Sequence, residues 1–239
     1  MRVSLHTDKA VKVLDYVKSL ELSGGGIRAW AGQDAYPEVS GYLIPTLLDY
    51  GEKELAIRIG KWLVTIQNDD GSFNGLDGVP RSFDTAACME GLKRLGYRKS
   101  VLLAEKWLLG LVRDDGAVRI SNENMDTHLY TMRVSWLLDS KEGVNYWTKA
   151  EWEPTREHYI AYALEGLWGM RRYKFVREKL LERDWLSDDL CANAQFASIA
   201  YKAGVSHHKY YDYVEKYYGE VSNSWSAKWI LDMWGICGN

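Results

Sequence analysis

Two kinds of helical sequence alternate along the chain, and this alternation constrains the fold more than any other feature. Apolar residues recur at helical spacing in segments such as 10–20 and 55–66, which are charged on their other faces. Segments such as 84–95 and 193–203 instead carry small or aromatic residues on most faces. A helix that is apolar nearly all round is buried, so we expect the charged helices outside and the small-residue helices inside.

The inner segments repeat at intervals of about 30 to 44 residues, in the range of two-helix repeat units. One helical hairpin cannot bury its own apolar face, whereas six hairpins closed into a ring bury all of theirs. The sequence therefore predicts an all-α fold, an α/α toroid of six helical hairpins in a single domain over residues 1–239. The fourth outer segment, 141–154, is short and ends at a proline, so we expect a stunted helix there. The expected starts of the inner helices are near Ser40, Asp84, Asp126, Arg156, Asn193 and Ser224.

Charge and cysteine content exclude several classes of protein. The formal net charge of −3 and the lack of a basic stripe argue against nucleic acid as a partner. No apolar stretch approaches the ~18 residues that span a bilayer, and the N-terminal sequence lacks the apolar core of a signal peptide. The 3 cysteines have unrelated spacings, which argues against a disulfide framework. We therefore expect a cytoplasmic protein that contacts no membrane.

Aromatic residues are abundant and mostly polar-tipped. The chain has 11 Trp and 16 Tyr but only 4 Phe, and such side chains suit a cleft that is half apolar and half wet. A helical core that uses Tyr and Trp explains the same composition.

Two segments resemble known toroids. Segment 58–75, RIGKWLVTIQNDDGSFNG, resembles the QW-type turn of terpenoid cyclases and protein prenyltransferase β-subunits, in which Gln67 would brace the helix end. Segment 104–118, AEKWLLGLVRDDGAV, is a degenerate second copy with Val112 in place of the glutamine. Five further segments, in order, resemble nearly the whole length of six-hairpin glycosidase-type proteins from polysaccharide gene clusters: YPEVSGYLIPTLLDYG, SFDTAACMEGLKRLG, THLYTMRVSWLL, HYIAYALEGLW and LCANAQFASIAYKAG. This resemblance implies a toroid that handles carbohydrate and leaves the reaction open.

In a ring of hairpins, the loops that lead into the inner helices gather on one face. The catalytic candidates there are Glu38, Asp126, Asp84 and His128. The candidates for substrate binding are Trp30, Tyr36, Tyr42, Arg156, His158, Asn193, Gln195, Trp225 and Lys228. Carboxylates, amides and aromatic rings are the groups that bind and cleave sugars.

The candidate roles follow from position. Glu38 lies between Tyr36 and Tyr42, where partial desolvation would raise its pKa and make it the acid. Asp126, at an expected helix N-terminus, would stay ionised as base or nucleophile and face Glu38 across the mouth. Asp84 could replace either one, although helix capping alone also explains both aspartates.

The remaining candidates would bind substrate or transfer a proton. His128 could act as the base if a proton is abstracted beside a uronate, or it could fill a polar core. Arg156 and Lys228 would hold the carboxylate of such a substrate, and Trp30 and Trp225 would stack on its ring.

Three functions remain open at this point. The first is an enzyme that cleaves or epimerises a polar or uronate-containing glycan, with a small molecule or oligosaccharide as substrate. The others are a non-catalytic glycan-binding or scaffold toroid, and a terpenoid cyclase or prenyltransferase-like enzyme. No phosphate-binding loop follows a strand, so no cofactor is expected. Asp189 and Cys191 form an Asp-x-Cys pair, but the spacing to His207 and His208 does not suit zinc, and we expect no metal.

Overall fold

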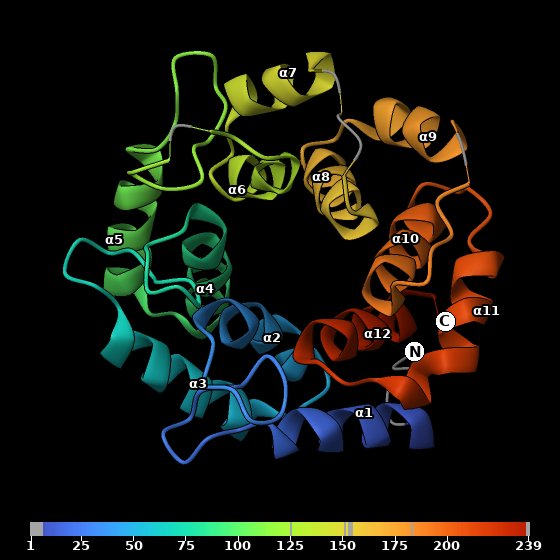
Figure 1. Ribbon diagram of the computed structural model, residues 1–239, viewed down its shortest axis with the longest axis horizontal. Helices are drawn as coiled ribbons and strands as arrows, with labels where there is room; N and C mark the ends of the chain where they lie inside the picture. Colours follow the sequence, from blue (N-terminus) through green and yellow to red (C-terminus); the bar gives the residue numbers. More distant parts are fainter. Residues whose placement is uncertain (1–6, 125, 151, 153–154, 183, 238–239) are drawn as a thin grey trace.

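The computed structural model describes residues 7–124, 126–150, 152, 155–182 and 184–237. Its helices form two concentric rings, with outer and inner helices alternating along the chain (Figure 1). The described segments contain isolated β-bridges and no strand. The predicted α/α toroid is confirmed. The outer helices are α1 (Asp8–Ser19), α3 (Lys53–Ile66), α5 (Arg98–Leu109), α7 (Lys141–Lys149), α9 (Tyr173–Leu181) and α11 (His208–Tyr217), the last followed by a short 3₁₀ helix (Tyr218–Glu220).

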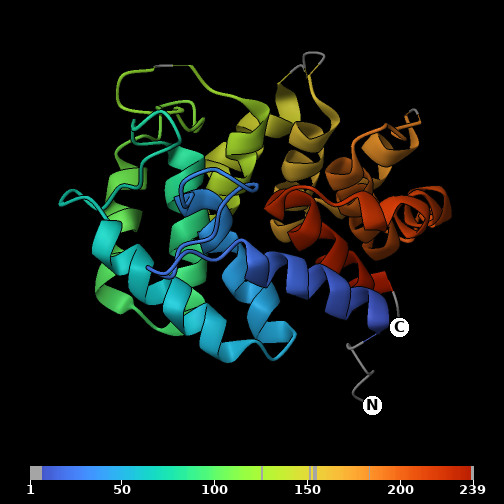
Figure 2. The same ribbon diagram turned by 60° about the horizontal axis from the view of Figure 1, so that its bottom comes forward.

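Each inner helix packs against the next one, and the last packs against the first, which closes the ring. α12 also lies beside α1, so the first and last helices meet (Figures 1 and 2). No helix in the described ranges has the length and apolar character needed to cross a membrane. The inner helices are α2 (Pro37–Asp49), α4 (Ser82–Leu95), α6 (Met132–Leu137) with a preceding 3₁₀ helix (Leu129–Thr131), α8 (Glu157–Gly169), α10 (Leu190–Lys202) and α12 (Ser224–Cys237).

Small residues explain why the inner ring closes tightly. A Cβ atom on Gly41 of α2 would lie 2.6 Å from the backbone of Cys88 in α4. A Cβ atom on Gly91 would lie 2.2 Å from the carbonyl oxygen of Gly41. Glycine therefore lets these two backbones touch, which is the packing that the small-residue inner segments predict.

The QW-like turn and the short outer helix also match the sequence. Gln67 Nε2 donates hydrogen bonds to the carbonyls of Gly71 and Ser100, both at 2.9 Å, and so ties the end of α3 to its own turn and to α5. α7 has only 9 residues, as does α9, and Pro154 lies outside the described residues.

Candidate functional site

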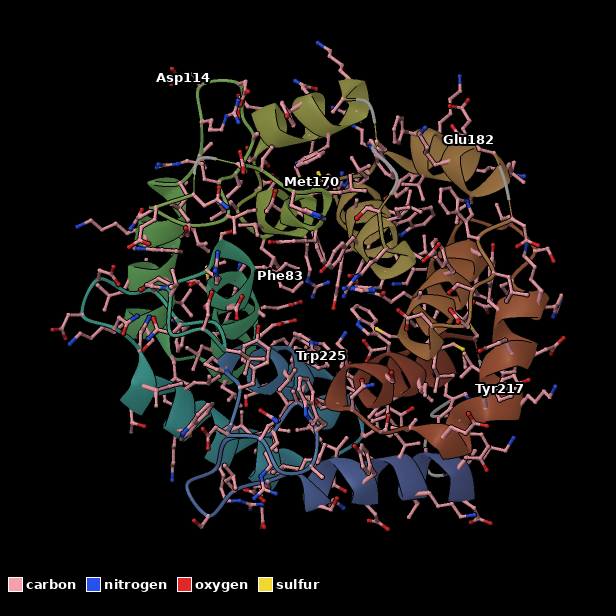
Figure 3. The ribbon with its side chains drawn as sticks, viewed as in Figure 1. Phe83, Asp114, Met170, Glu182, Tyr217 and Trp225 are labelled. Atoms are coloured by element: carbon pink, nitrogen blue, oxygen red, sulfur yellow. The ribbon has the colours of Figure 1, made fainter. Side chains whose placement is uncertain are left out.

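A cavity of about 660 Å³ lies where the N-terminal ends of the inner helices converge. Phe83 and Trp225 point toward its centre (Figure 3). Seven of the sequence candidates line it: Trp30, Tyr36, Glu38, Asp84, Arg156, His158 and Trp225. The other lining residues, which the sequence candidates do not include, are Gly75, Leu76, Asp77, Arg81, Phe83, Ile120, Tyr130, Tyr159, Tyr162, Asp189, Cys191, Asn223 and Ser226.

The expected helix N-terminus near Asp126 is wrong, whereas the one near Asp84 is confirmed although Asp84 is not the N-cap. Asp126 is exposed and does not line the cavity, because its segment runs on without helical structure until the 3₁₀ helix that begins at Leu129. Its backbone N–H donates to Asn124 Oδ1 at 2.9 Å, and its own side chain caps no helix. Asp84 lies inside the first turn of α4, whose N-cap is Arg81.

His128 lies behind the cavity wall and does not line the cavity. Its ring stacks on Tyr130 with centroids 4.5 Å apart and meets the edge of Tyr159 at 4.7 Å. Burial, together with the charge of nearby His158, lowers the pKa of His128. The sequence spacing placed His128 just inside an inner helix, whereas the structure places it as the residue before one.

Three more candidates for substrate binding are buried and contact other protein groups instead of the cavity. Asn193 is fully buried and donates from Nδ2 to the carbonyl of Ser187 at 2.8 Å, and Gln195 is buried beside Cys191. Lys228 is buried at the other end of the ring axis, where its ammonium lies 2.5 Å from Asp232 Oδ2. None of these three side chains lines the cavity at the mouth: Gln195 and Lys228 lie beyond the first turns of their helices, and Asn193 bonds to Ser187.

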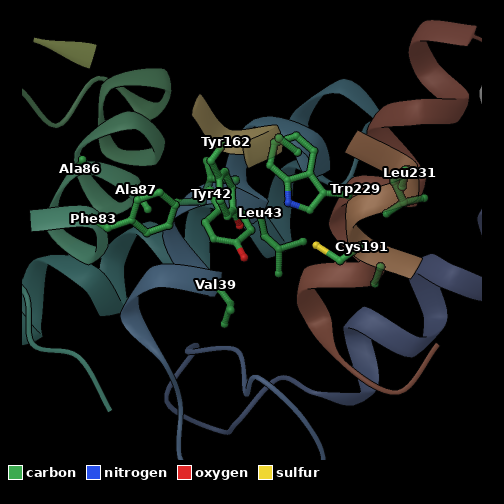
Figure 4. Packing of buried hydrophobic residues seen from close by; sticks show 14 of the residues in the cluster. Val39, Tyr42, Leu43, Phe83, Ala86, Ala87, Tyr162, Cys191, Trp229 and Leu231 are labelled. Carbon is green, nitrogen blue, oxygen red and sulfur yellow. The ribbon is translucent and has the colours of Figure 1, made fainter. Parts of the chain in front are cut away.

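Lys228 lines a second cavity of about 280 Å³ toward the C-terminal ends of the inner helices. Arg133 of α6 crosses this end of the ring and pairs with Glu90 of α4, at 2.5 Å, and with Glu165 of α8. Tyr42 also lines this cavity, and with Tyr162 and Trp229 it forms the aromatic layer between the two ends (Figure 4).

Glu38, in the first turn of α2, is 7% exposed. The Trp225 indole donates a hydrogen bond from Nε1 to Glu38 Oε1 at 3.0 Å. Burial raises the pKa of Glu38, and interactions with the Tyr36 hydroxyl and the Trp225 indole oppose this rise without cancelling it. The direction agrees with the sequence prediction, and its cause is desolvation.

Asp84 forms the second half of a carboxyl pair with Glu38. It is 5% exposed, and burial together with the neighbouring charge of Glu38 raises the pKa of Asp84 to about 8. The Tyr36 hydroxyl interacts with both carboxyl groups. Asp84 Oδ1 is buried without a hydrogen-bond partner among the described residues. Two carboxyl groups held this way retain a proton near neutral pH, because two adjacent buried charges are costly.

His158 and Asp189 form a second polar pair. His158 Nδ1 lies 3.1 Å from Asp189 Oδ2, while Asp189 Oδ1 accepts the backbone N–H of Cys191 at 2.8 Å and of Ala192 at 3.2 Å. Asp189 is thus the N-cap of α10. An aspartate directly before the apolar inner segment is the sequence signal for this cap.

The Asp189 and Cys191 pair has no metal-binding surroundings. Within the described ranges, no group of three or more His, Cys, Asp or Glu side chains is arranged to hold a metal ion. His207 and His208 lie at the start of the outer helix α11. Both carboxylate oxygens of Asp189 already have partners, in the α10 backbone and in His158.

Aromatic rings form much of the remaining cavity wall. Trp30 and Trp225 lie with their ring centroids 5.6 Å apart, and Phe83 meets Tyr130 at 5.3 Å and Tyr162 at 4.8 Å. A cavity with aromatic walls and a few converging polar groups is typical of a small-molecule site.

Comparison with known proteins shows the fold alone. No family model matches the sequence, and no curated protein matches it. A protein from Actinoplanes superposes with a TM-score of 0.74 at 11% identity, covering 97% of this chain and 99% of that one. A protein described as a novel alpha-amylase from Clostridium perfringens gives 0.71 at 13% identity, with 98% of each chain covered. A type II terpene cyclase from Scytonema, bound to geranylgeranyl dihydroxybenzoate, gives 0.62 at 10% identity over 94% of this chain and 77% of that one.

Proposed function

We propose that this chain is a carbohydrate-active enzyme whose acid and base chemistry uses the carboxyl pair Glu38 and Asp84. The observation that carries the proposal is two buried carboxyl groups that share one cavity, with raised pKa values and no ion pair to a described residue. Such groups are costly to fold and are typical of sites that transfer protons. The likeness in fold to a protein described as an alpha-amylase supports a sugar substrate.

The cavity suits a sugar for two reasons. Trp30 and Trp225 stand at its side as flat apolar surfaces on which a sugar ring can stack. Asp77, Arg81 and His158 add charged and hydrogen-bonding groups that hydroxyl groups require.

A prenyl or terpenoid substrate is the second candidate, because aromatic walls and a protonated carboxyl group also suit carbocation chemistry. The likeness in fold to a terpene cyclase supports this alternative. The number of charged side chains around the cavity favours the sugar. A glycan-binding protein without turnover would have the same aromatic surfaces but no need for the carboxyl pair.

The test is turnover of an oligosaccharide panel by wild type, Glu38→Gln and Asp84→Asn, with a prenyl diphosphate as the competing substrate. We expect each variant to lose roughly 10²–10⁴-fold in kcat while it still binds sugar by calorimetry. Asp212→Asn, on the exposed face of α11, is the matched control and should keep full activity. Turnover of the prenyl compound alone would refute the proposal, and sugar binding without any turnover would favour a binding protein.

We further propose that the enzyme works in the cytoplasm. All three cysteines, Cys88, Cys191 and Cys237, are free thiols, which is consistent with a reducing compartment.

A further inference from the structure

The cavity has two chemically different walls. The inner helices follow one another around the ring, so α8 and α10 stand across the cavity from α2 and α4 (Figure 1). α2 and α4 carry the carboxyl pair, whereas the N-terminal ends of α8 and α10 carry Arg156, His158 and Asp189. All of these side chains line the same space.

Asp189 fixes the orientation and the tautomer of His158. One oxygen of Asp189 is held by two backbone N–H groups of α10, so the other oxygen is fixed 3.1 Å from His158 Nδ1. Burial acts to raise the pKa of Asp189, but the hydrogen bonds from His158 and from the α10 backbone outweigh it and leave the pKa lowered. An ionised carboxylate only accepts hydrogen bonds, so the proton of neutral His158 resides on Nδ1 and its lone pair on Nε2.

Arg156 supplies a positive charge beside this histidine. It is the N-cap residue of α8, two positions before His158, and its side chain is exposed at the cavity. The other guanidinium that lines the cavity, Arg81, forms an ion pair with Asp77. No ion pair joins Arg156 to any residue that the structure describes, so its planar fork is available to a carboxylate.

We propose that the substrate is a uronate-containing glycan, that Arg156 binds the uronate carboxylate, and that His158, positioned by Asp189, is the catalytic base of a β-elimination. This inference rests on the proposed carbohydrate function. It also replaces His128 and Lys228 in the roles that the sequence suggested for them, because neither lines this cavity.

The reaction balances without any other reactant. His158 Nε2 takes the proton from C5 of the uronate, whose acidity is increased by the pairing of its carboxylate with Arg156. The electron pair forms a C4–C5 double bond while the C4–O bond breaks, and the departing oxygen takes a proton from the Glu38 and Asp84 pair. The proton on His158 then passes to solvent, and the carboxyl pair regains one from solvent. The products are an unsaturated uronate end and a shortened glycan.

Activity should fall as the pH rises and the carboxyl pair loses its proton, because the departing oxygen takes that proton. The titratable groups that face His158 are Asp189 from α10, Glu38 from α2, His128 from the segment before α6, and Tyr159 and Tyr162 from α8 itself.

The first experiment offers oligomers of a uronic acid and matched neutral oligosaccharides to the wild-type protein. Reducing ends are counted, and the ultraviolet absorbance of the unsaturated product is followed. We expect turnover of the uronate oligomers with one unsaturated end for each bond cleaved. Cleavage of either substrate without the absorbance change would overturn the inference and leave the proposed function standing. Turnover of no sugar at all would overturn the proposed function.

The second experiment compares Asp189→Asn, His158→Gln and Arg156→Gln. Asparagine is a comparable N-cap, so Asp189→Asn keeps the α10 cap, but it no longer requires a proton on Nδ1. We expect it to lower kcat by roughly 10²–10⁴-fold, as when a histidine base loses its orienting aspartate. Arg156→Gln should weaken calorimetric binding of uronate oligomers at least about tenfold and leave neutral oligosaccharides unaffected. The controls, His207→Gln at the start of α11 and Arg177→Gln on α9, should behave as wild type.

The third experiment reads the tautomer without any substrate. Nitrogen NMR of the wild-type protein should find neutral His158 protonated on Nδ1, and Asp189→Asn should shift that proton toward Nε2. Protonation of wild-type His158 on Nε2 would overturn the assignment of His158 as the base.

Discussion

The two ends of the ring axis surround their acidic side chains in opposite ways. Toward the C-terminal ends of the inner helices, Arg133 is only 4% exposed and reaches Glu90 and Glu165, while Lys228 reaches Asp232. Toward the N-terminal ends, Glu38 and Asp84 are buried and form no ion pair with any described residue. The carboxylates near the C-terminal ends are thus paired with cations, whereas Glu38 and Asp84 are not and retain a proton instead.

This contrast separates stability from chemistry. A buried carboxylate is tolerated when a cation and hydrogen bonds compensate its lost hydration, as at the Arg133 end. Without them the group remains protonated, and the folded state is less stable at high pH. At the Glu38 end this loss of stability accompanies a proton held near neutral pH, which a reaction can use.

Removal of Arg133 should produce the largest effect. Arg133→Met leaves the partly buried Glu90 and Glu165 without their cation, so we expect a loss of about 3 kcal/mol in the free energy of unfolding, at the lower end of the range for a broken buried pair. Chemical denaturation of the purified variant measures it.

Arg94→Met is the matched control for that loss. Arg94 pairs with Asp49 at 2.8 Å at the same end of the ring, but both side chains are exposed, so the expected loss is about 0–1 kcal/mol. Equal losses in the free energy of unfolding of the two variants would contradict the expectation that the buried ion pairs of Arg133 stabilise the fold more than the exposed pair of Arg94.

The carboxyl pair should make stability depend on pH in a defined direction. Burial and the neighbouring charge of Glu38 raise the pKa of Asp84 to about 8 in the folded protein, from 3.8 in the unfolded chain. Unfolding therefore releases a proton from this group between these values, so the contribution of Asp84 to stability is fully present below about pH 4 and is lost as the pH rises toward 8. Glu38, whose pKa is also raised, contributes in the same direction.

Asp84→Asn isolates this contribution, because asparagine cannot ionise. We expect its free energy of unfolding to exceed that of wild type by an amount that grows to a few kcal/mol between pH 4 and pH 8. Denaturation curves at several pH values measure the difference, with Asp212→Asn as the exposed control. A difference that stays constant with pH would contradict the raised pKa of Asp84.

The sequence was sufficient for the ring but only partly for the site. Helical periodicity and small residues are local properties, so the inner and outer helices could be assigned from segments such as 84–95. The QW-like turn likewise placed Gln67 correctly. Site geometry depends on where each inner helix starts. Because α6 starts at Met132 and not near Asp126, Asp126 lies outside the cavity.

The partner of Glu38 could not be read from spacing. The sequence favours Asp126 because it is expected on the third inner helix, which is not adjacent to the first and could therefore face Glu38 across the mouth. The cavity instead joins Glu38 to Asp84 on the neighbouring helix. The close contact of α2 and α4, which Gly41 and Gly91 permit, brings those two carboxyl groups together. That packing is a tertiary property, as is the pairing of His158 with Asp189.

The smallest expected effect concerns the pKa of Glu38 and its hydrogen bond from Trp225. The Trp225 indole N–H donates to Glu38 Oε1 at 3.0 Å and favours the ionised carboxylate. Trp225→Phe keeps an aromatic ring but removes the donor, so the pKa of Glu38 should rise further. The basic limb of the pH profile of kcat should then move to higher pH by less than about one unit, equivalent to about 1 kcal/mol. Trp234→Phe is the matched control, since Trp234 also donates from Nε1 to a carboxylate, that of Glu215, but lies outside the cavity. A shift in both variants, or a shift of the Trp225→Phe limb to lower pH, would show that the indole does not tune the carboxyl pair.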